Sequence, residues 1–116
     1  MEIKQVTTIN EFDKLTESWR TLDVWTFGPL AELEDDEEVV VTVGIVDDEV
    51  VTYLIADCEG HYLWHIETKQ GHNGNGYAKI LVIDADVQMA YEVCSDAGAA
   101  FCDALNIDFD DAREIF

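Results

Sequence analysis

The sequence predicts a single α/β domain over residues 1–116, with a central, mostly antiparallel mixed sheet flanked by helices. Three observations support this fold class. Hydrophobic residues make up 48 % of the 116 positions, enough for one core. Strand-type and helix-type patterns follow one another in the order β-α-β-β-β-α-β-α, with a further strand possible at the end. Three of the seven glycines, Gly71, Gly74 and Gly76, gather between a predicted strand and a predicted helix.

The first elements are a short strand at 3–6 and a helix over 8–22. Thr8 and Glu11 have the spacing of a capping box, which typically begins a helix. The apolar residues of this segment recur at helical intervals and predict one buried face: Phe12, Leu15, Trp19 and Leu22. Residues 23–38 contain the single proline, Pro29, and a run of acids, and predict an irregular, solvated connection.

The middle of the chain predicts three antiparallel strands at 39–46, 50–58 and 61–69. Asp47-Asp48 separates two β-branched runs and predicts a tight hairpin, and Glu59-Gly60 predicts a second turn. Beyond the glycines, the patterns predict a short helix at 76–85, a strand at 87–94 and a helix at 95–106 whose N-cap is Ser95 or Asp96. Residues 107–116 are expected to form a last strand or a frayed tail.

The charge balance is strongly acidic, with 26 acidic and 6 basic residues and a formal net charge of -20. Such a field repels nucleic acids and anionic membranes, so we expect neither as a partner. Acids spread along the whole chain, together with few lysines, are typical of proteins from salt-loving microbes or their viruses; the alternative is an ordinary acidic interaction protein. No apolar run is long enough to cross a membrane and no signal peptide is recognised. We therefore expect a cytoplasmic protein, or a virion component if it is viral.

The cysteines and carboxylates show no metal-binding pattern. Cys58, Cys94 and Cys102 are an odd number without metal-type spacing, and are expected to be free thiols. Asp84 and Asp86, after an apolar run, resemble the aspartate pair of haloacid dehalogenase-type phosphatases. Only 30 residues follow Asp86, too few for that fold, so we reject this alternative and expect no metal.

The stretch "QGHNGNGYAKIL", residues 70–81, is the most informative motif. At a helix N-terminus several backbone N–H groups lack an intrahelical partner and can bind an anion. Gly74 and Gly76 leave room for close approach of a ligand. The alternative is that the glycines only make a tight turn, because glycine-rich loops alone are weak signals.

These features resemble the GCN5-related N-acetyltransferases. In this family an Arg/Gln-x-x-Gly-x-Gly/Ala signature follows the fourth strand, and Gly74 and Gly76 match its two glycines. "YLWHIETK" resembles the fourth strand, and Phe101, Leu105 and Ile107 match a later segment; the resemblance covers about residues 38–107. Gly71 replaces the usual Arg/Gln, Ser95 the usual Asn, Cys102 the usual Tyr and Asn106 the usual Gly.

The resemblance implies an acyl-CoA N-acyltransferase-like fold that binds acetyl-CoA. The implied cofactor-binding residues lie on the fourth strand and the loop: Ile66, Thr68, Gly71, His72, Asn73, Gly74, Asn75, Gly76 and Tyr77. The pantetheine arm would lie where the fourth and fifth strands splay apart. Glu67 or His65 is the candidate general base, with Glu67 preferred, and Cys102 is the candidate acid for the leaving thiolate. The alternatives are that Glu67 is a surface acid and that Cys102 only packs.

We therefore expect an N-acetyltransferase that transfers an acetyl group from acetyl-CoA to an amine. The alternative is a non-catalytic protein of the same fold that serves as a binding or structural component, for example of a halophilic virus particle or a small complex. The missing loop Arg/Gln, Cys102 and the net charge of -20 favour the alternative. The glycine spacing and Glu67 favour the enzyme.

Overall fold

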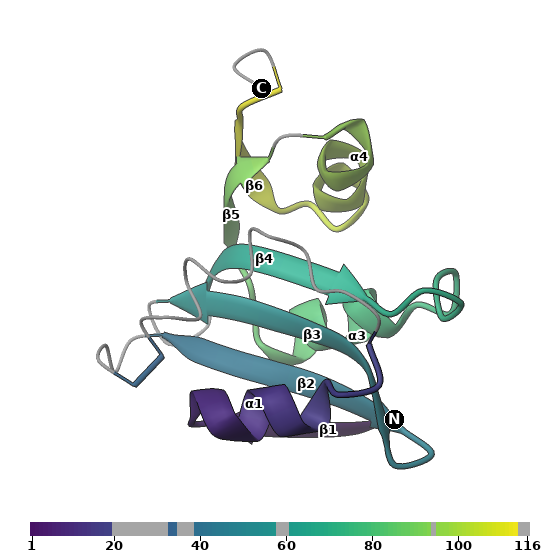
Figure 1. Cartoon of the computed structure of the whole chain (residues 1–116). Coiled ribbons are helices and arrows are strands. Elements are labelled where there is room, and N and C mark those ends of the chain that lie inside the picture. The colour runs from purple at the N-terminus through teal and green to yellow at the C-terminus, as the bar shows by residue number, and fades with distance from the viewer. Residues whose placement is uncertain (20–32, 35–38, 58–60, 94, 114–116) are drawn as a thin grey trace.

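A computed structural model describes residues 1–19, 33–34, 39–57, 61–93 and 95–113 (Figure 1). These segments form a six-stranded sheet in the order β1-β2-β3-β4-β5-β6. The strands are β1 (Glu2–Val6), β2 (Val40–Val46), β3 (Glu49–Asp57), β4 (Tyr62–Thr68), β5 (Met89–Val93) and β6 (Asp108–Asp111). The helices are α1 (Ile9–Leu15), α3 (Tyr77–Asp84) and α4 (Asp96–Ala104).

The sheet is mixed, as predicted. Strands β1 to β4 form antiparallel pairs, whereas β4 pairs with β5, and β5 with β6, in parallel. The β2–β3 hairpin turns at Asp47-Asp48, where both residues have positive φ (52° and 63°), as a two-residue primed turn requires. For residues 107–116 the sequence left open a last strand or a frayed tail. The structure has a strand there, β6, which follows α4 and lies parallel to β5.

Two apolar clusters cover the two faces of the sheet. On the α1 face, Phe12 and Trp19 pack against strand residues; the buried members are Val6, Phe12, Trp19, Leu33, Val39, Val41, Val43, Val50, Tyr53 and Ile55. On the other face, α3 and α4 pack; the buried members are Leu54, Ala56, Leu63, Leu81, Val82, Val87, Ala90, Cys102 and Ile107. Figure 1 shows α1 in front of the sheet, α3 behind it and α4 beside β6.

Helix α1 begins as predicted but ends earlier than the predicted residue 22. The Thr8 hydroxyl accepts a hydrogen bond from Glu11 N at 3.2 Å, which is half of a capping box. The helix ends at Leu15, because Thr16 leaves helical geometry and its hydroxyl bonds back to Phe12 O at 2.9 Å. Trp19 lies beyond the helix, buried, and its indole N–H donates to Val50 O at 2.9 Å.

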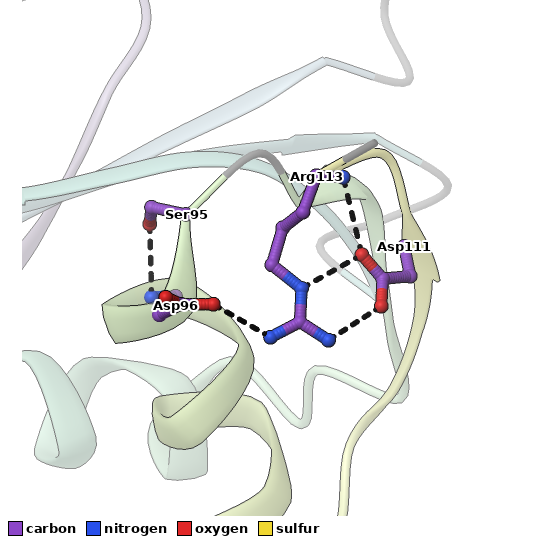
Figure 2. Close-up of polar contacts among 5 residues, drawn as sticks. Ser95, Asp96, Asp111 and Arg113 are labelled. Carbon is purple, nitrogen blue, oxygen red and sulfur yellow. Dashed lines mark hydrogen bonds and ion pairs between the residues drawn. The ribbon is translucent and has the colours of Figure 1, made fainter. Parts of the chain in front are cut away.

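Helix α4 is joined to β6 by a network of side chains (Figure 2). The Ser95 hydroxyl caps the helix by accepting from Gly98 N at 3.0 Å, which confirms Ser95 as the N-cap. The Arg113 guanidinium donates to Asp111 Oδ2 at 2.6 Å and to Asp96 Oδ1 at 2.9 Å (Figure 2). Arg113 therefore links the first turn of α4 to the end of the last strand.

Several predictions lie outside the described residues. These are the position of Leu22, the connection with Pro29, the turn at 59–60, and the thiols of Cys58 and Cys94. Within the described part of the chain, no helix is long and apolar enough to cross a membrane.

Candidate functional site

The candidate site begins where β4 and β5 separate. The two strands pair only at Tyr62↔Met89 and Leu63↔Ala90, and they diverge beyond these pairs, as the resemblance implied. Lys69 N donates to Val51 O of β3 at 2.8 Å. Successive residues of a strand send their backbone groups to alternate edges. The backbone groups of Thr68 and Ile66 therefore face the opening toward β5, away from β3.

The glycine loop adopts a backbone that explains its composition. Gly71, Gly74 and Gly76 have φ of 93°, 86° and 77°, in the region that only glycine adopts at little cost. A Cβ atom at any of the three would meet nothing within 4 Å, so close packing does not demand these glycines. The loop thus presents an open backbone surface, and Gly76 is the N-cap of α3.

A first cavity of about 350 Å³ lies over the loop and the start of α3; we call it the loop cavity. The first helical hydrogen bond of α3 runs from Ile80 N to Gly76 O, so the amides of the preceding residues are not used within the helix. The cavity is lined by Thr68, His72, Asn73, Gly74, Gly76, Tyr77, Ala78, Lys79, Phe101, Ala104 and Leu105. It therefore combines loop backbone, first-turn residues of α3 and an apolar wall from α4.

Lys79 is the cation of the loop cavity. It lies in the first turn of α3, is exposed, and takes part in none of the ion pairs formed among the described residues. Lys4, Lys69 and Arg113, by contrast, all pair with carboxylates. First-turn amides together with a lysine suit an anionic group. This residue was not among the predicted site residues, because only the fold shows which side of α3 faces the cavity.

A second cavity of about 680 Å³ lies at the end of β4; we call it the Glu67 cavity. Its lining residues are mostly polar: Ser18, Trp19, Glu67, Thr68, Lys69, Gln70, Gly71 and Asn73. Thr68 and Asn73 line both cavities, so the two adjoin at the end of β4. Lys69 pairs with Glu49 and donates to Ser18 Oγ at 3.1 Å, which links the segment after α1 to this edge of the sheet.

Glu67 lies in a cluster of three polar side chains on the α1 face. The Tyr53 hydroxyl donates to Glu67 Oε2 at 2.5 Å, and His65 Nε2 lies 3.7 Å from the same oxygen. The side chain of Glu67 is 25 % exposed and that of His65 is 15 % exposed. The prediction that Glu67 and His65 share one face of the sheet, opposite Ile66, is confirmed. The partner Tyr53 was missed, because it lies fourteen residues earlier on β3.

The predicted cofactor residues divide between four environments. Thr68, His72, Asn73, Gly74, Gly76 and Tyr77 line the loop cavity. Gly71 lines only the Glu67 cavity. Ile66 packs against the α3 and α4 core, and the Asn75 side chain donates to His72 O at 3.1 Å within the loop. The predicted loop residues therefore do not all face one ligand site in this geometry.

Cys102 lines neither cavity. Its side chain is buried in the core on the α3 and α4 face, and burial, with a smaller contribution from Asp103, raises the pKa of the thiol. Neighbouring residues of α4 line the loop cavity, but Cys102 does not. Its predicted role as an acid stays a prediction, and its position favours packing.

The described residues contain no group of three or more His, Cys, Asp or Glu side chains that could hold a metal ion. No protein-family model matches the chain, and no curated protein sequence matches it. Solved structures do match.

The fold is that of the acetyltransferases related to GCN5. The aminoglycoside N-acetyltransferase AAC(6')-Iy, in complex with CoA, matches with a TM-score of 0.63 and 14 % identity, over 92 % of this chain and 87 % of that one. An aminoglycoside 6'-N-acetyltransferase from Acinetobacter haemolyticus matches with a TM-score of 0.62 and 16 % identity, over 96 % and 92 % of the two chains.

A ribosomal-protein-alanine N-acetyltransferase from Brucella melitensis matches with a TM-score of 0.56 and 20 % identity, over 90 % of this chain and 89 % of that one. At these identities the likeness shows the fold. The resemblance found in the sequence is confirmed at that level.

Proposed function

We propose that the chain is a member of the GCN5-related N-acetyltransferases that transfers an acetyl group from acetyl-CoA to an amine. The observation that carries this proposal is the junction of the two cavities at Thr68. One cavity has an open glycine backbone and a helix N-terminus, and the other contains a carboxylate held by a buried tyrosine. A site for an anionic cofactor thus adjoins a site for a cationic substrate. Solved acetyltransferases with the same fold, one of them a CoA complex, support this reading.

The residues of the loop cavity fit a CoA pyrophosphate. The amides at the start of α3 would donate to phosphate oxygens, and Lys79 would neutralise part of their charge. The backbone groups of Thr68 and Ile66 face the strand opening, where a pantetheine arm would be held by hydrogen bonds. Phe101, Ala104 and Leu105 offer an apolar wall beside it.

The residues of the Glu67 cavity fit an amine acceptor. Bound acetyl-CoA would supply the activated acetyl thioester. Glu67 would take a proton from the acceptor ammonium, which frees the nitrogen lone pair for attack on the thioester carbonyl. Ser18, Gln70 and Asn73 would hold polar groups of the acceptor. We propose an acceptor with a polar body, because most of this lining is polar.

A second candidate function is a non-catalytic protein of the same fold that serves in a complex or a virus particle. The buried position of Cys102 favours this candidate, because Cys102 is the predicted acid for the leaving thiolate and it lines neither cavity. We also propose that the protein works at high salt. With a net charge of -20, an anionic cofactor would be repelled unless the charge is screened.

Calorimetric titration with CoA in 1 M KCl tests the enzyme proposal. Wild-type protein is expected to bind CoA saturably, and Gly74→Val or Gly76→Val should weaken binding by more than tenfold, because each new side chain would enter the loop cavity. Asn106→Val is the matched control. Asn106 also has a positive φ (55°) but lines neither cavity. Its substitution by valine therefore introduces the backbone strain of a positive φ without placing a side chain in a cavity.

Transfer is then measured with three acceptors: kanamycin, a peptide that begins with alanine, and spermine. Glu67→Gln should leave CoA binding intact and slow transfer by about 10²–10⁴-fold, the usual contribution of a general base. Failure of wild-type protein to bind CoA at millimolar concentration in high salt would defeat the proposal and favour the non-catalytic candidate.

A further inference from the structure

The strand register brings Tyr53, Glu67 and His65 together on the α1 face of the sheet. Tyr53 and Glu67 are direct partners in the β3–β4 ladder. The register then shifts, since Ile55 pairs with His65 but Ala56 pairs with Leu63, which leaves one extra residue on β4. This bulge allows Leu63 to face the α3 and α4 core while His65 and Glu67 face α1. The cluster is therefore a product of the sheet, not of a mobile loop.

Tyr53 holds the carboxylate of Glu67 in place. Its ring is fully buried between Phe12 and Trp19, with ring centroids 5.1 and 5.2 Å away. Its hydroxyl donates to Glu67 Oε2 at 2.5 Å. This hydrogen bond holds in a fixed position the oxygen that would accept the proton of the substrate.

His65 offers the second site for the proton. Its Nε2 atom is buried and has no hydrogen-bond partner among the described residues. Buried polar atoms are normally paired, so an unpaired one needs an explanation. This nitrogen lies 3.7 Å from Glu67 Oε2, slightly beyond a hydrogen bond, and catalytic contacts are often long before substrate binds. A small movement of either side chain would close it.

We propose that Tyr53, Glu67 and His65 act as one acid–base unit, in which the proton taken by Glu67 passes to His65 Nε2. This inference rests on the proposed function and deepens it. The ammonium of the acceptor loses one proton to Glu67 Oε2 and becomes a neutral amine. The proton then moves to Nε2, with the ring hydrogen on Nδ1, which gives an imidazolium and restores the carboxylate. Imidazole is a common acceptor of protons in catalysis, so a histidine is a chemically suitable second site for this proton.

Among the residues that the structure describes, the groups packed around the unit are apolar or already paired. From the α1 side, the described ring neighbours of Tyr53 are Phe12 and Trp19, which do not titrate. Lys69 lines the same cavity, but it is paired with Glu49. Glu67 would contact the substrate, so it is the catalytic residue; Tyr53 and His65 are positioning residues that act through it.

NMR of protein labelled with ¹⁵N-histidine tests the unit without any need for activity. The His65 signals are assigned by their loss in His65→Gln. At pH 6.5 the protonated fraction of His65 should fall at least threefold in Glu67→Gln. The control is Asp57→Asn, which removes the same charge from β3 but lies away from His65 in the ladder. Equal effects of the two substitutions, or no effect of Glu67→Gln, would overturn the proposal.

Kinetics with the acceptors named above give a second readout. His65→Gln should lower kcat by about 10–100-fold at pH 7 and leave CoA affinity unchanged. Tyr53→Phe keeps the packed ring but removes the donor that holds the Glu67 carboxylate. Because both residues act through that carboxylate, the double variant Tyr53→Phe/His65→Gln should lose less activity than the sum of the two single losses. Additive losses in the double variant would indicate a merely structural role and refute the unit.

The two proposals fail in different ways. Absence of CoA binding in the wild type would defeat the acetyltransferase proposal whatever the NMR result. CoA binding together with a His65 protonated fraction that does not depend on Glu67 would defeat only the acid–base unit. His61→Gln serves as a folding and assay control, because His61 contacts Asp86 and not the cluster; a loss of activity in this variant would count against a specific role for His65.

Discussion

Charge reversal at Lys79 should separate a specific phosphate contact from the general field of the protein. Lys79 lines the loop cavity and is free of ion pairs with the described residues. Lys79→Glu changes the formal net charge from -20 to -22, since a charge of +1 becomes -1. Lys14→Glu makes the same change at an exposed position in the last turn of α1, on the opposite face of the sheet.

The expected magnitude follows from the exposure of Lys79. Two unit charges about 4 Å apart in water interact by about 1 kcal/mol. Reversal of one charge turns this attraction into an equal repulsion, so the binding free energy should change by about 2 kcal/mol. This corresponds to a loss of CoA affinity of roughly 30-fold at 0.1 M salt, where the Debye length is about 10 Å. At 1 M salt the Debye length is about 3 Å, so most of the loss should disappear.

The assay is calorimetric titration with CoA at both salt concentrations. Lys14→Glu should weaken binding by no more than about threefold at 0.1 M salt, because its charge lies across the sheet from the cavity. Equal losses in the two variants would show that only the net charge matters. That result would refute the assignment of the loop cavity as a phosphate site.

Three further predictions concern stability and the remaining residues. Thermal unfolding should shift to higher temperature between 0.1 and 3 M KCl, because screening relieves the repulsion of a net charge of -20; a flat dependence would refute the high-salt proposal. Hydrogen bonds from Arg113 lower the pKa of Asp111 to about 2. The folded state therefore gains stability above the ordinary carboxyl pKa of 3.8 and loses it as the pH falls toward 2. Arg113→Gln should be less stable than wild type in urea melts at pH 5, and most of this difference should be lost at pH 2; a constant difference at both would contradict this linkage. Cys102→Ala should lower the free energy of unfolding by about 1–2 kcal/mol with no change in transfer rate, if the thiol only packs; a selective loss of rate would instead support its predicted role as an acid.

Much of the local structure follows from short stretches of sequence. The Asp47-Asp48 turn, the caps at Thr8 and Ser95, and the glycine N-cap of α3 are all where the sequence predicts them. These features depend on hydrogen bonds and dihedral preferences within about four residues, so local patterns suffice. The strands β2, β3 and β4 can be predicted equally well, because their alternation and β-branched residues are local signals.

The end of α1 shows where the local signal fails. Leu15, Trp19 and Leu22 continue a helical period, yet the helix ends at Leu15. The Trp19 indole instead bonds to Val50 O and packs on Tyr53, both on β3. A partner about thirty residues away in sequence thus outweighs helical periodicity, and no local pattern contains that partner.

By itself, the sequence determined the order of the elements, the glycine loop at a helix N-terminus, the acidic character and the candidate base Glu67. Only the tertiary structure decided which residues meet around them. The β3–β4 register sets Glu67 opposite Tyr53 with His65 on the same face, and the packing of α3 and α4 turns Lys79 toward a cavity while it buries Cys102. The physical reason is that strand register and helix packing join residues far apart in the chain, and their geometry depends on the whole core.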